Sequence, residues 1–350
     1  MCESVLEAIG NTPLINLNLG LPQSSADIWI KVESANPGGS IKDRPALNMI
    51  HEAEQRGDLA PGGTVVESTS GNLGVALAMI CAVKGYRCIV VADPRTSKTN
   101  LDAARAFGAQ VEIVTTKNLA DGTFQEARIK RARELAQSIE GAFMPWQYGN
   151  PDNPAAHQRQ TAQEILKAFP DGPDALVASV STAGHLSGLA RGLKDAQVAT
   201  KIVGVDVEGS VVFGGQKSPT AITGMGLGWQ PENLELRMVD EAFKVAAEPA
   251  LGMARVIARK AGMLLGGSSG AAIFVGVAQA LRMQPGQAVV VIAPDRGEKY
   301  LSEFYDDQWC KARGLFLENR IEKLVDKAWK ISPIRYPSVE KGFVSSDERD

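Results

Sequence analysis

Three short apolar runs alternate with three helical segments between Thr64 and Gly141. The runs TVVE, RCIVVAD and QVEIVTT cover residues 64–67, 87–93 and 110–116, and a segment of helical character follows each of them. Apolar strands that alternate with helices predict a parallel sheet covered on both faces. Residues 64–141 are therefore expected to form one α/β unit.

A turn-rich break, PWQYGNPDNP at residues 145–154, separates this unit from a second one. Clusters of proline, glycine and asparagine of this kind mark connections between units. Further helices are expected over 43–57, 155–169, 185–196, 248–262 and 269–283, and strands over 27–33, 174–180, 201–208 and 287–294. The predicted architecture is two α/β lobes with a cleft between them. From about Asp306 the chain is charged and amphipathic, and this part is expected to pack on the outside or on a partner.

Composition excludes several classes of protein. The 350 residues are 44% hydrophobic and carry a net charge of −3, as in an ordinary soluble globular protein. Neither a long basic run nor a membrane-length apolar stretch is present, and the N-terminus does not read as a signal peptide. The four cysteines form no CxxC pair and the three histidines are widely separated, which disfavours a disulfide framework or a histidine metal site. A cytoplasmic protein with no nucleic-acid, membrane or metal partner is expected.

The motif NPGGSIKDR, residues 36–44, places Lys42 just after a Gly-Gly turn and just before an acid-base pair. Most lysines are solvated surface charges. A tight glycine turn, however, lets the backbone approach a flat ligand closely. A lysine withdrawn from water has a lowered pKa and becomes a nucleophile. Lys42 is therefore the candidate catalytic residue.

Two further motifs follow apolar strands and open helices. In ESTSGNLG, residues 67–74, hydroxyls and backbone N–H groups meet at a helix N-terminus, where an anion is stabilised. In STAGH, residues 181–185, the same arrangement makes a nest for a phosphate group. The second motif lacks the Gly-Lys-Ser/Thr ending of a nucleotide-binding P-loop. A lysine beside such anion cradles predicts an amino acid joined to a carbonyl cofactor.

These motifs resemble those of the pyridoxal-phosphate (PLP) enzymes of the cysteine synthase type, from about Val5 to about Tyr305. The resemblance implies the fold type II (tryptophan synthase β-like) architecture, with the active site in a cleft between two parallel-sheet lobes. It implies a homodimer with PLP as cofactor, a larger cofactor-binding lobe at residues 1–42 and 149–350, and a smaller mobile lobe at 43–148. Lys42 would form the Schiff base with PLP and act as acid and base. Cofactor contacts are implied for Asn72, Ser181, Thr182, Ala183, Gly184, His185 and Ser268.

The hydroxyl of Ser268 is implied to face the pyridine nitrogen of PLP. A neutral hydroxyl cannot keep that nitrogen protonated as an aspartate would, so the ring is a weaker electron sink. This favours elimination of a β-leaving group over transamination. The GMGLG run at residues 224–228 is implied to lie near the substrate.

Several residues depart from the cysteine synthase pattern. Leu73, Tyr148 and Asp295 stand where threonine, phenylalanine and serine are common, and Ser181 and His185 depart from the more glycine-rich phosphate loop of that family. These departures disfavour sulfide and favour a branch that joins O-phospho-L-serine to L-glutamate, giving a precursor of 2,3-diaminopropionate. The phosphate needs a cation, for which Arg128 is the first candidate and Arg44 the second. Substrate contacts are expected for Ser68, Thr69, Ser70, Gly71, Gln147, Tyr148, Arg128 and Gly224.

Other functions stay open at this point. A cysteine or S-sulfocysteine synthase, using sulfide or thiosulfate, is the nearest alternative. A serine/threonine dehydratase fits the Asn72 motif less well. A non-catalytic regulatory protein of the same fold would have no need to retain Lys42. A nicotinamide dehydrogenase is disfavoured, because the G-x-G within residues 224–228 follows no clear strand and lacks a downstream ribose-binding acid.

Overall fold

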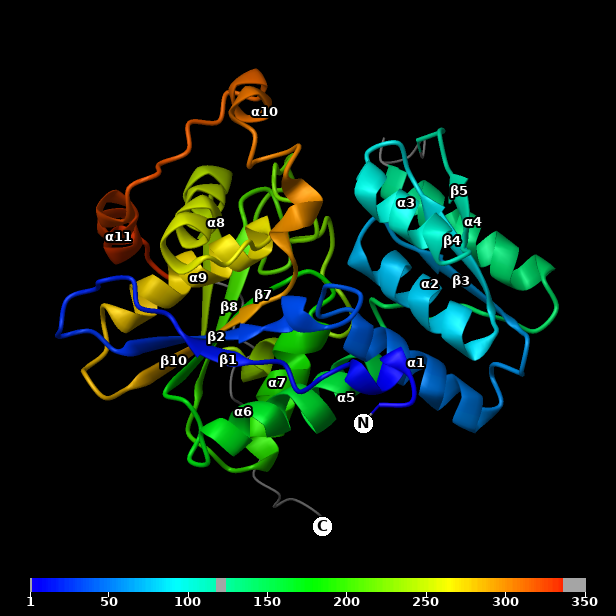
Figure 1. Ribbon diagram of the computed structural model, residues 1–350, viewed down its shortest axis with the longest axis horizontal. Coiled ribbons are helices and arrows are strands. Elements are labelled where there is room, and N and C mark those ends of the chain that lie inside the picture. Colours follow the sequence, from blue (N-terminus) through cyan, green and yellow to red (C-terminus); the bar gives the residue numbers. More distant parts are fainter. Residues whose placement is uncertain (1, 118–123, 336–350) are drawn as a thin grey trace, which may run out of the picture.

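The computed structural model describes residues 2–117 and 124–335 and contains two sheets (Figure 1). The larger sheet has the strand order β1-β2-β10-β7-β8-β9. The first pair, β1 with β2, is antiparallel, and the other neighbours are parallel. Its strands are β1 (Leu14–Asn16), β2 (Asp27–Val32), β7 (Ala175–Ser179), β8 (Lys201–Val207), β9 (Glu241–Val245) and β10 (Ala288–Ala293).

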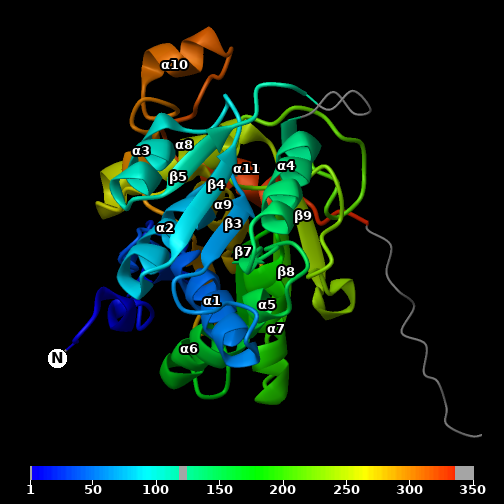
Figure 2. The same cartoon turned by 90° about the vertical axis from the view of Figure 1, so that its right-hand side faces the viewer.

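The smaller sheet is parallel throughout, with the order β5-β4-β3-β6. Its strands are β3 (Thr64–Ser68), β4 (Arg87–Ala92), β5 (Gln110–Ile113) and β6 (Ala142–Phe143). The three predicted strands of this unit are thus confirmed. Helices α2 (Asn72–Lys84) and α3 (Lys98–Ala106) cover one face, and α4 (Phe124–Ser138) covers the other (Figure 2). The expected start of α4, at Gly122, lies outside the described residues.

The two faces of the smaller sheet follow from the alternation of side chains along each strand. Val65 and Val90 pack against α2, while Val66 and Val91 pack toward α4. The central strands β3 and β4 are buried on both faces, apart from the first residue of β4, so their sequences are nearly continuous apolar runs. The edge strand β5 is only partly buried. The predicted two-sided α/β unit is confirmed.

The lysine motif lies between the sheets. After β2 the chain forms a short 3-10 turn, η2 (Glu33–Ala35), passes the Gly-Gly turn and begins α1 (Asp43–Arg56) directly after Lys42. Pro45 occupies the first turn of α1, where its missing N–H costs nothing, and Gly57 ends the helix with φ 77°. Helix α1 packs on α2 of the smaller unit and on α5 of the larger one.

Helices cover both faces of the larger sheet. One side carries α5 (Asp152–Ala156), a π-helical turn (His157–Thr161), α6 (Ala162–Ala168) and α7 (Gly184–Asp195). The single helix expected over 155–169 is therefore interrupted. The π turn lies where α7 approaches closely: a Cβ on Gly188 would meet the carbonyl oxygen of Pro154 at 2.1 Å. The other side carries α8 (Ala247–Ala261) and α9 (Gly267–Ala280).

The C-terminal region packs on the outside of these helices. Of the two expected positions, on the outside or on a partner, the structure shows the first. After the short turn η5 (Gly297–Tyr300) come α10 (Asp307–Ala312) and α11 (Ile321–Lys330). Ile321, Leu324 and Ala328 of α11 are buried in the core that α8 and α9 share with the larger sheet. The short turns η1 (Val5–Ala8) and η4 (Leu236–Met238) complete the elements. None of the described helices has the length and apolar character needed to cross a membrane.

Candidate active site

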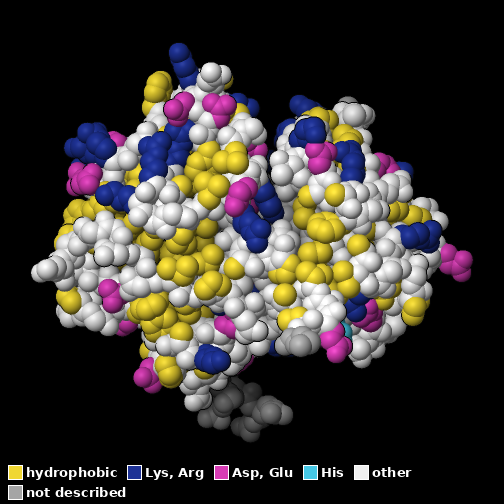
Figure 3. Space-filling model, viewed as in Figure 1, with side chains coloured by type: hydrophobic (Ala, Val, Ile, Leu, Met, Phe, Trp, Pro, Cys, Tyr) yellow, Lys and Arg dark blue, Asp and Glu magenta, His cyan; other side chains and the backbone are white. Residues whose placement is uncertain are grey.

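A cavity of about 420 Å³ lies between the two sheets, and Figure 3 shows the hollow between the two halves of the molecule. Lys42 lies in its wall. The smaller half contributes the turn at residues 69–73 and the larger half contributes residues 181–182, 220 and 222–224. A smaller pocket of about 30 Å³ shares Lys42 and includes His185, Ser268 and Asp295.

The structure brings most of the predicted site residues together. The residues that line one or both pockets are Lys42, Thr69, Ser70, Gly71, Asn72, Arg128, Gln147, Tyr148, Ser181, Thr182, His185, Gly224 and Ser268. Leu73 and Asp295, noted as departures, line them as well. Ser68, Ala183 and Gly184 belong to the same two turns without lining either pocket.

Lys42 is withdrawn from bulk water. Burial lowers the pKa of its amine from 10.5 to about 8, and the negative charge of Asp295 partly opposes this shift. An amine with this pKa is partly neutral near physiological pH. It can therefore act as a nucleophile and as a base.

Asp295 follows β10 and is fully buried beside Lys42. The Asn72 amide donates a hydrogen bond of 2.8 Å to Asp295 Oδ2, and the Tyr300 hydroxyl donates one of 2.6 Å to the same oxygen. Lys299 Nζ donates to Asn72 Oδ1 at 2.5 Å. Burial raises the pKa of Asp295, while Lys299 and these hydrogen bonds oppose the rise. The predicted cofactor residue Asn72 is thus oriented by a carboxylate from the other sheet.

The turn at residues 181–185 has the form of an anion nest at the N-terminus of α7. Ala183 has the left-handed φ of 61°, which directs successive backbone N–H groups to one side. A Cβ on Gly184 would lie 2.0 Å from Asn153 Oδ1, so this position requires glycine. The Nε2 atom of His185 is buried with no hydrogen-bond partner in the described part of the chain. This nest fits a phosphate group.

The turn at residues 68–71 forms a second anion cradle at the N-terminus of α2. Behind it lies Glu67, whose buried carboxylate accepts hydrogen bonds from the backbone N–H of Ser68 at 2.9 Å and of Gln147 at 3.4 Å. Burial raises the pKa of Glu67 to about 8, although these backbone donors oppose the rise. Glu67 therefore fixes Gln147 next to the cradle. Sequence reasoning missed this role, because no motif links residues 80 positions apart.

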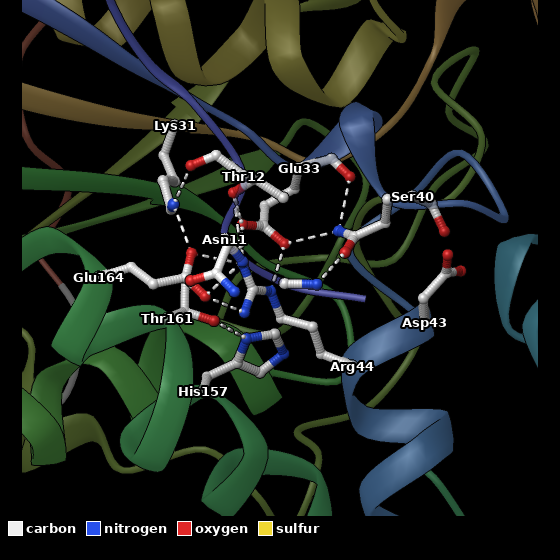
Figure 4. A network of polar contacts seen from close by, with 12 residues as sticks. Asn11, Thr12, Lys31, Glu33, Ser40, Asp43, Arg44, His157, Thr161 and Glu164 are labelled. Carbon is white, nitrogen blue, oxygen red and sulfur yellow. Dashed lines mark hydrogen bonds and ion pairs between the residues drawn. The ribbon is translucent and has the colours of Figure 1, made fainter. Parts of the chain in front are cut away.

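The two arginines considered for phosphate binding have different surroundings. The Arg128 side chain is 5% exposed and lines the cavity, with Nε 3.1 Å from Asp93 Oδ2. Its Nη1 has no hydrogen-bond partner among the described residues. Arg44 does not line the cavity. Its guanidinium donates to Glu33 at 2.7 and 2.9 Å and to Glu164 at 2.6 and 2.7 Å, in the buried network of Figure 4. The prediction of Arg44 as the second candidate for phosphate binding is therefore wrong, because its donors already bind Glu33 and Glu164.

Comparison with known proteins agrees with the geometry. A family model described as "Pyridoxal-phosphate dependent enzyme" matches residues 5–295. The chain belongs to this family of PLP-dependent enzymes. It is 39% identical to N-(2-amino-2-carboxyethyl)-L-glutamate synthase of Cupriavidus metallidurans, over 88% of the chain and 91% of that protein. It is 38% identical to cysteine synthase of Staphylococcus aureus, over 86% of the chain and 96% of that protein.

Solved structures of related enzymes share the fold. O-acetylserine dependent cystathionine beta-synthase from Helicobacter pylori superposes with a TM-score of 0.80 at 34% identity, covering 87% of this chain and 98% of that one. O-ureido-L-serine synthase superposes with a TM-score of 0.81 at 33% identity, covering 89% and 99%. The predicted fold type II architecture, PLP cofactor and enzyme class are confirmed. The chain is a PLP-dependent β-replacement enzyme of the cysteine synthase family.

Proposed function

We propose that this enzyme condenses O-phospho-L-serine with L-glutamate to give N-(2-amino-2-carboxyethyl)-L-glutamate and phosphate. The product would serve as a 2,3-diaminopropionate precursor for siderophores or peptide antibiotics, and the enzyme would act as a cytoplasmic homodimer. The observation that supports this most directly is Arg128, whose side chain lines the cavity at 5% exposure and whose Nη1 has no hydrogen-bond partner among residues 2–117 and 124–335. An arginine with a free donor suits a phosphate ester, whose leaving group is a dianion. The 39% identity to the N-(2-amino-2-carboxyethyl)-L-glutamate synthase of Cupriavidus metallidurans points the same way.

The residues of the lysine motif and of the 181–185 nest would hold PLP. When bound, PLP withdraws electrons from the α-carbon of the substrate, which acidifies its proton and allows the β-substituent to depart. Lys42, with a pKa of about 8, removes that proton and later returns it. The nest would hold the cofactor phosphate, and the neutral hydroxyl of Ser268, which lines the same small pocket as Lys42, would be the partner of the pyridine nitrogen.

The remaining wall residues bind the substrate. The hydroxyls of Thr69 and Ser70, with the N-terminus of α2, hold the carboxylate of phosphoserine. Gln147, fixed from behind by Glu67, completes this cradle. Arg128 binds the phosphate before and after the carbon–oxygen bond breaks. Movement of the smaller lobe, residues 43–148, toward the larger one would then exclude water from the reacting carbon.

A cysteine or S-sulfocysteine synthase is the second candidate, since the chain is also 38% identical to a cysteine synthase. The distinguishing experiment uses the purified holoenzyme. O-phospho-L-serine is added first and phosphate release is followed. L-glutamate, sulfide or thiosulfate is then added in parallel, and the products are identified by mass spectrometry. The proposal expects phosphate release and a product that contains glutamate. Products from sulfide or thiosulfate alone would establish the second candidate instead.

A further inference from the structure

An acidic side chain lines the cavity opposite the arginines. Glu303 follows η5, and its half-buried carboxylate forms no hydrogen bond or ion pair with the described residues. Its backbone N–H donates to the carbonyl of Tyr300 at 3.0 Å, which fixes the turn that carries it. Arg313 influences Glu303 electrostatically, yet its guanidinium stacks on the Trp309 ring, 4.1 Å from the ring centre. The Glu303 carboxylate therefore keeps its hydrogen-bonding capacity for a ligand.

The charges around the cavity are separated. Arg128 and Arg95 lie in the wall of the smaller half, and both pair at 3.1 Å with Asp93, whose carboxylate also lines the cavity. The guanidinium groups outnumber the carboxylate on this side, which therefore keeps a positive charge. Glu303 contributes negative charge from the larger half. A carboxylate in the wall repels a small anion such as hydrosulfide and attracts an ammonium group. This polarity suits a second substrate with an ammonium at one end and carboxylates at the other.

A second substrate of this kind must lose a proton before it reacts. The nitrogen of an amino acid is an ammonium at neutral pH and has no lone pair for attack. Burial raises the pKa of Glu303, although Arg313 opposes the rise, which makes its carboxylate a better proton acceptor than an exposed glutamate. Lys42 is committed to the proton of the α-carbon, so a separate acceptor is needed.

We propose that Glu303 binds the ammonium of the second amino-acid substrate and accepts one of its protons. This inference rests on the proposed function. The N–H bond breaks and its proton moves to the Glu303 carboxylate, while the freed lone pair forms the new carbon–nitrogen bond at the β-carbon. The electron pair of the former carbon–oxygen bond has left with phosphate, and a double bond joins the α- and β-carbons. As the carbon–nitrogen bond forms, the second pair of that double bond returns to the α-carbon, which takes up the proton that Lys42 holds. The new secondary amine keeps its other protons, and Glu303 returns its proton to water.

The test compares E303Q with wild-type holoenzyme in two separate steps. Phosphate release from O-phospho-L-serine reports the first step, and formation of the glutamate-containing product reports the second. The glutamine side chain keeps the shape and a hydrogen-bond acceptor but cannot take a proton. We expect E303Q to release phosphate at the wild-type rate and to lose about 100-fold in kcat/KM for L-glutamate. E303D should recover part of that loss. E322Q removes an exposed acid of α11 and should match wild type in both steps.

Glutarate gives a readout that does not depend on proton transfer. It has the two carboxylates of glutamate and lacks the amine, so its inhibition constant against L-glutamate should not weaken in E303Q. A purely structural defect would weaken glutarate and slow phosphate release together, which would overturn the inference. Wild-type kinetics with L-glutamate in E303Q would also overturn it and leave the proposed function intact. A wild-type enzyme that cannot use L-glutamate would overturn both.

Discussion

Asn72 and Asp295 connect the two sheets through a hydrogen bond of 2.8 Å. Asn72 opens α2 of the smaller half, and Asp295 follows β10 of the larger half. Tyr300 and Lys299 hold the same pair from the larger half, so the amide and the carboxylate have fixed orientations. The two walls of the cavity are therefore joined next to Lys42, which lines the same small pocket as Asn72 and Asp295.

Replacing Asp295 should change the titration of Lys42. Burial lowers the pKa of Lys42 to about 8 and the Asp295 carboxylate holds it from falling further. D295N removes that charge, so the pKa of Lys42 should fall below its wild-type value. The measurement is the pH dependence of Lys42 labelling by an amine-reactive reagent in cofactor-free protein, read by mass spectrometry. D307N, at an exposed position on α10, should titrate like wild type. A rise in the pKa of Lys42 in D295N would contradict the assigned electrostatics.

Replacing Arg128 should discriminate between leaving groups. R128M removes the donors proposed to bind phosphate, and a charge-assisted hydrogen bond contributes about 1.5–3 kcal/mol. We expect kcat/KM for O-phospho-L-serine to fall about 10- to 100-fold per such bond lost. O-acetyl-L-serine, which lacks the dianion, is the matched control substrate and should react at a nearly unchanged rate. Equal losses with both substrates would show that Arg128 acts through the structure of the wall.

Replacing Arg44 should destabilise the fold. R44M leaves Glu33 fully buried and without its bidentate partner. Removing one partner of a buried pair costs about 3–5 kcal/mol. The free energy of unfolding in denaturant measures this loss. R159M is the control, because Arg159 pairs with Glu52 at 61% side-chain exposure and should leave the unfolding midpoint almost unchanged. Equal midpoints for R44M and R159M would contradict the importance of the buried network.

Acid should destabilise the same network through Glu164. Burial alone would raise the pKa of Glu164, but hydrogen bonds and charges from Arg44 and Lys31 lower it from 4.5 to about 2. A carboxyl with a lower pKa in the folded state stabilises the protein fully above pH 4.5, and this contribution disappears as the pH falls toward 2. E164Q should therefore lose stability at neutral pH and show a flatter pH dependence between pH 4.5 and 2. Unfolding curves across this range measure the slope, and an unchanged slope in E164Q would rule out this linkage.

Local motifs made much of the molecule predictable. The glycine turn before Lys42 and the two helix-opening turns at residues 67–74 and 181–185 are contiguous in sequence, and each encodes its own geometry. The central strands β3 and β4 of the smaller sheet are buried on both faces, so their apolar runs predicted them. The strand β9 (Glu241–Val245) was not predicted, because two of its five residues are charged and the run is short. Its strand conformation depends on parallel pairing with β8, which the sequence does not reveal.

Long-range partners account for what sequence reasoning missed. The sequence made Arg44 a candidate for binding the substrate phosphate because it does not reveal the partners of this arginine. One of them, Glu164, lies 120 positions away. Glu303 belongs to no motif, and it becomes a candidate only because the chain after β10 returns to the cavity. Such roles depend on three-dimensional juxtaposition, which neither periodicity nor spacing encodes.

The left-handed Ala183 also affects how readily the nest binds its anion. An alanine at φ 61° is strained by about 1–2 kcal/mol relative to a right-handed conformation, and glycine would relieve that strain. Alanine, however, has fewer conformations than glycine in the unfolded chain, so less freedom is lost when the loop becomes ordered. Ala183 is fully buried in the core of the larger half, so its neighbours restrict the loop to this conformation. The nest is thus preorganised: its ordering entropy is lost during folding, and binding of a phosphate requires little further loss of freedom.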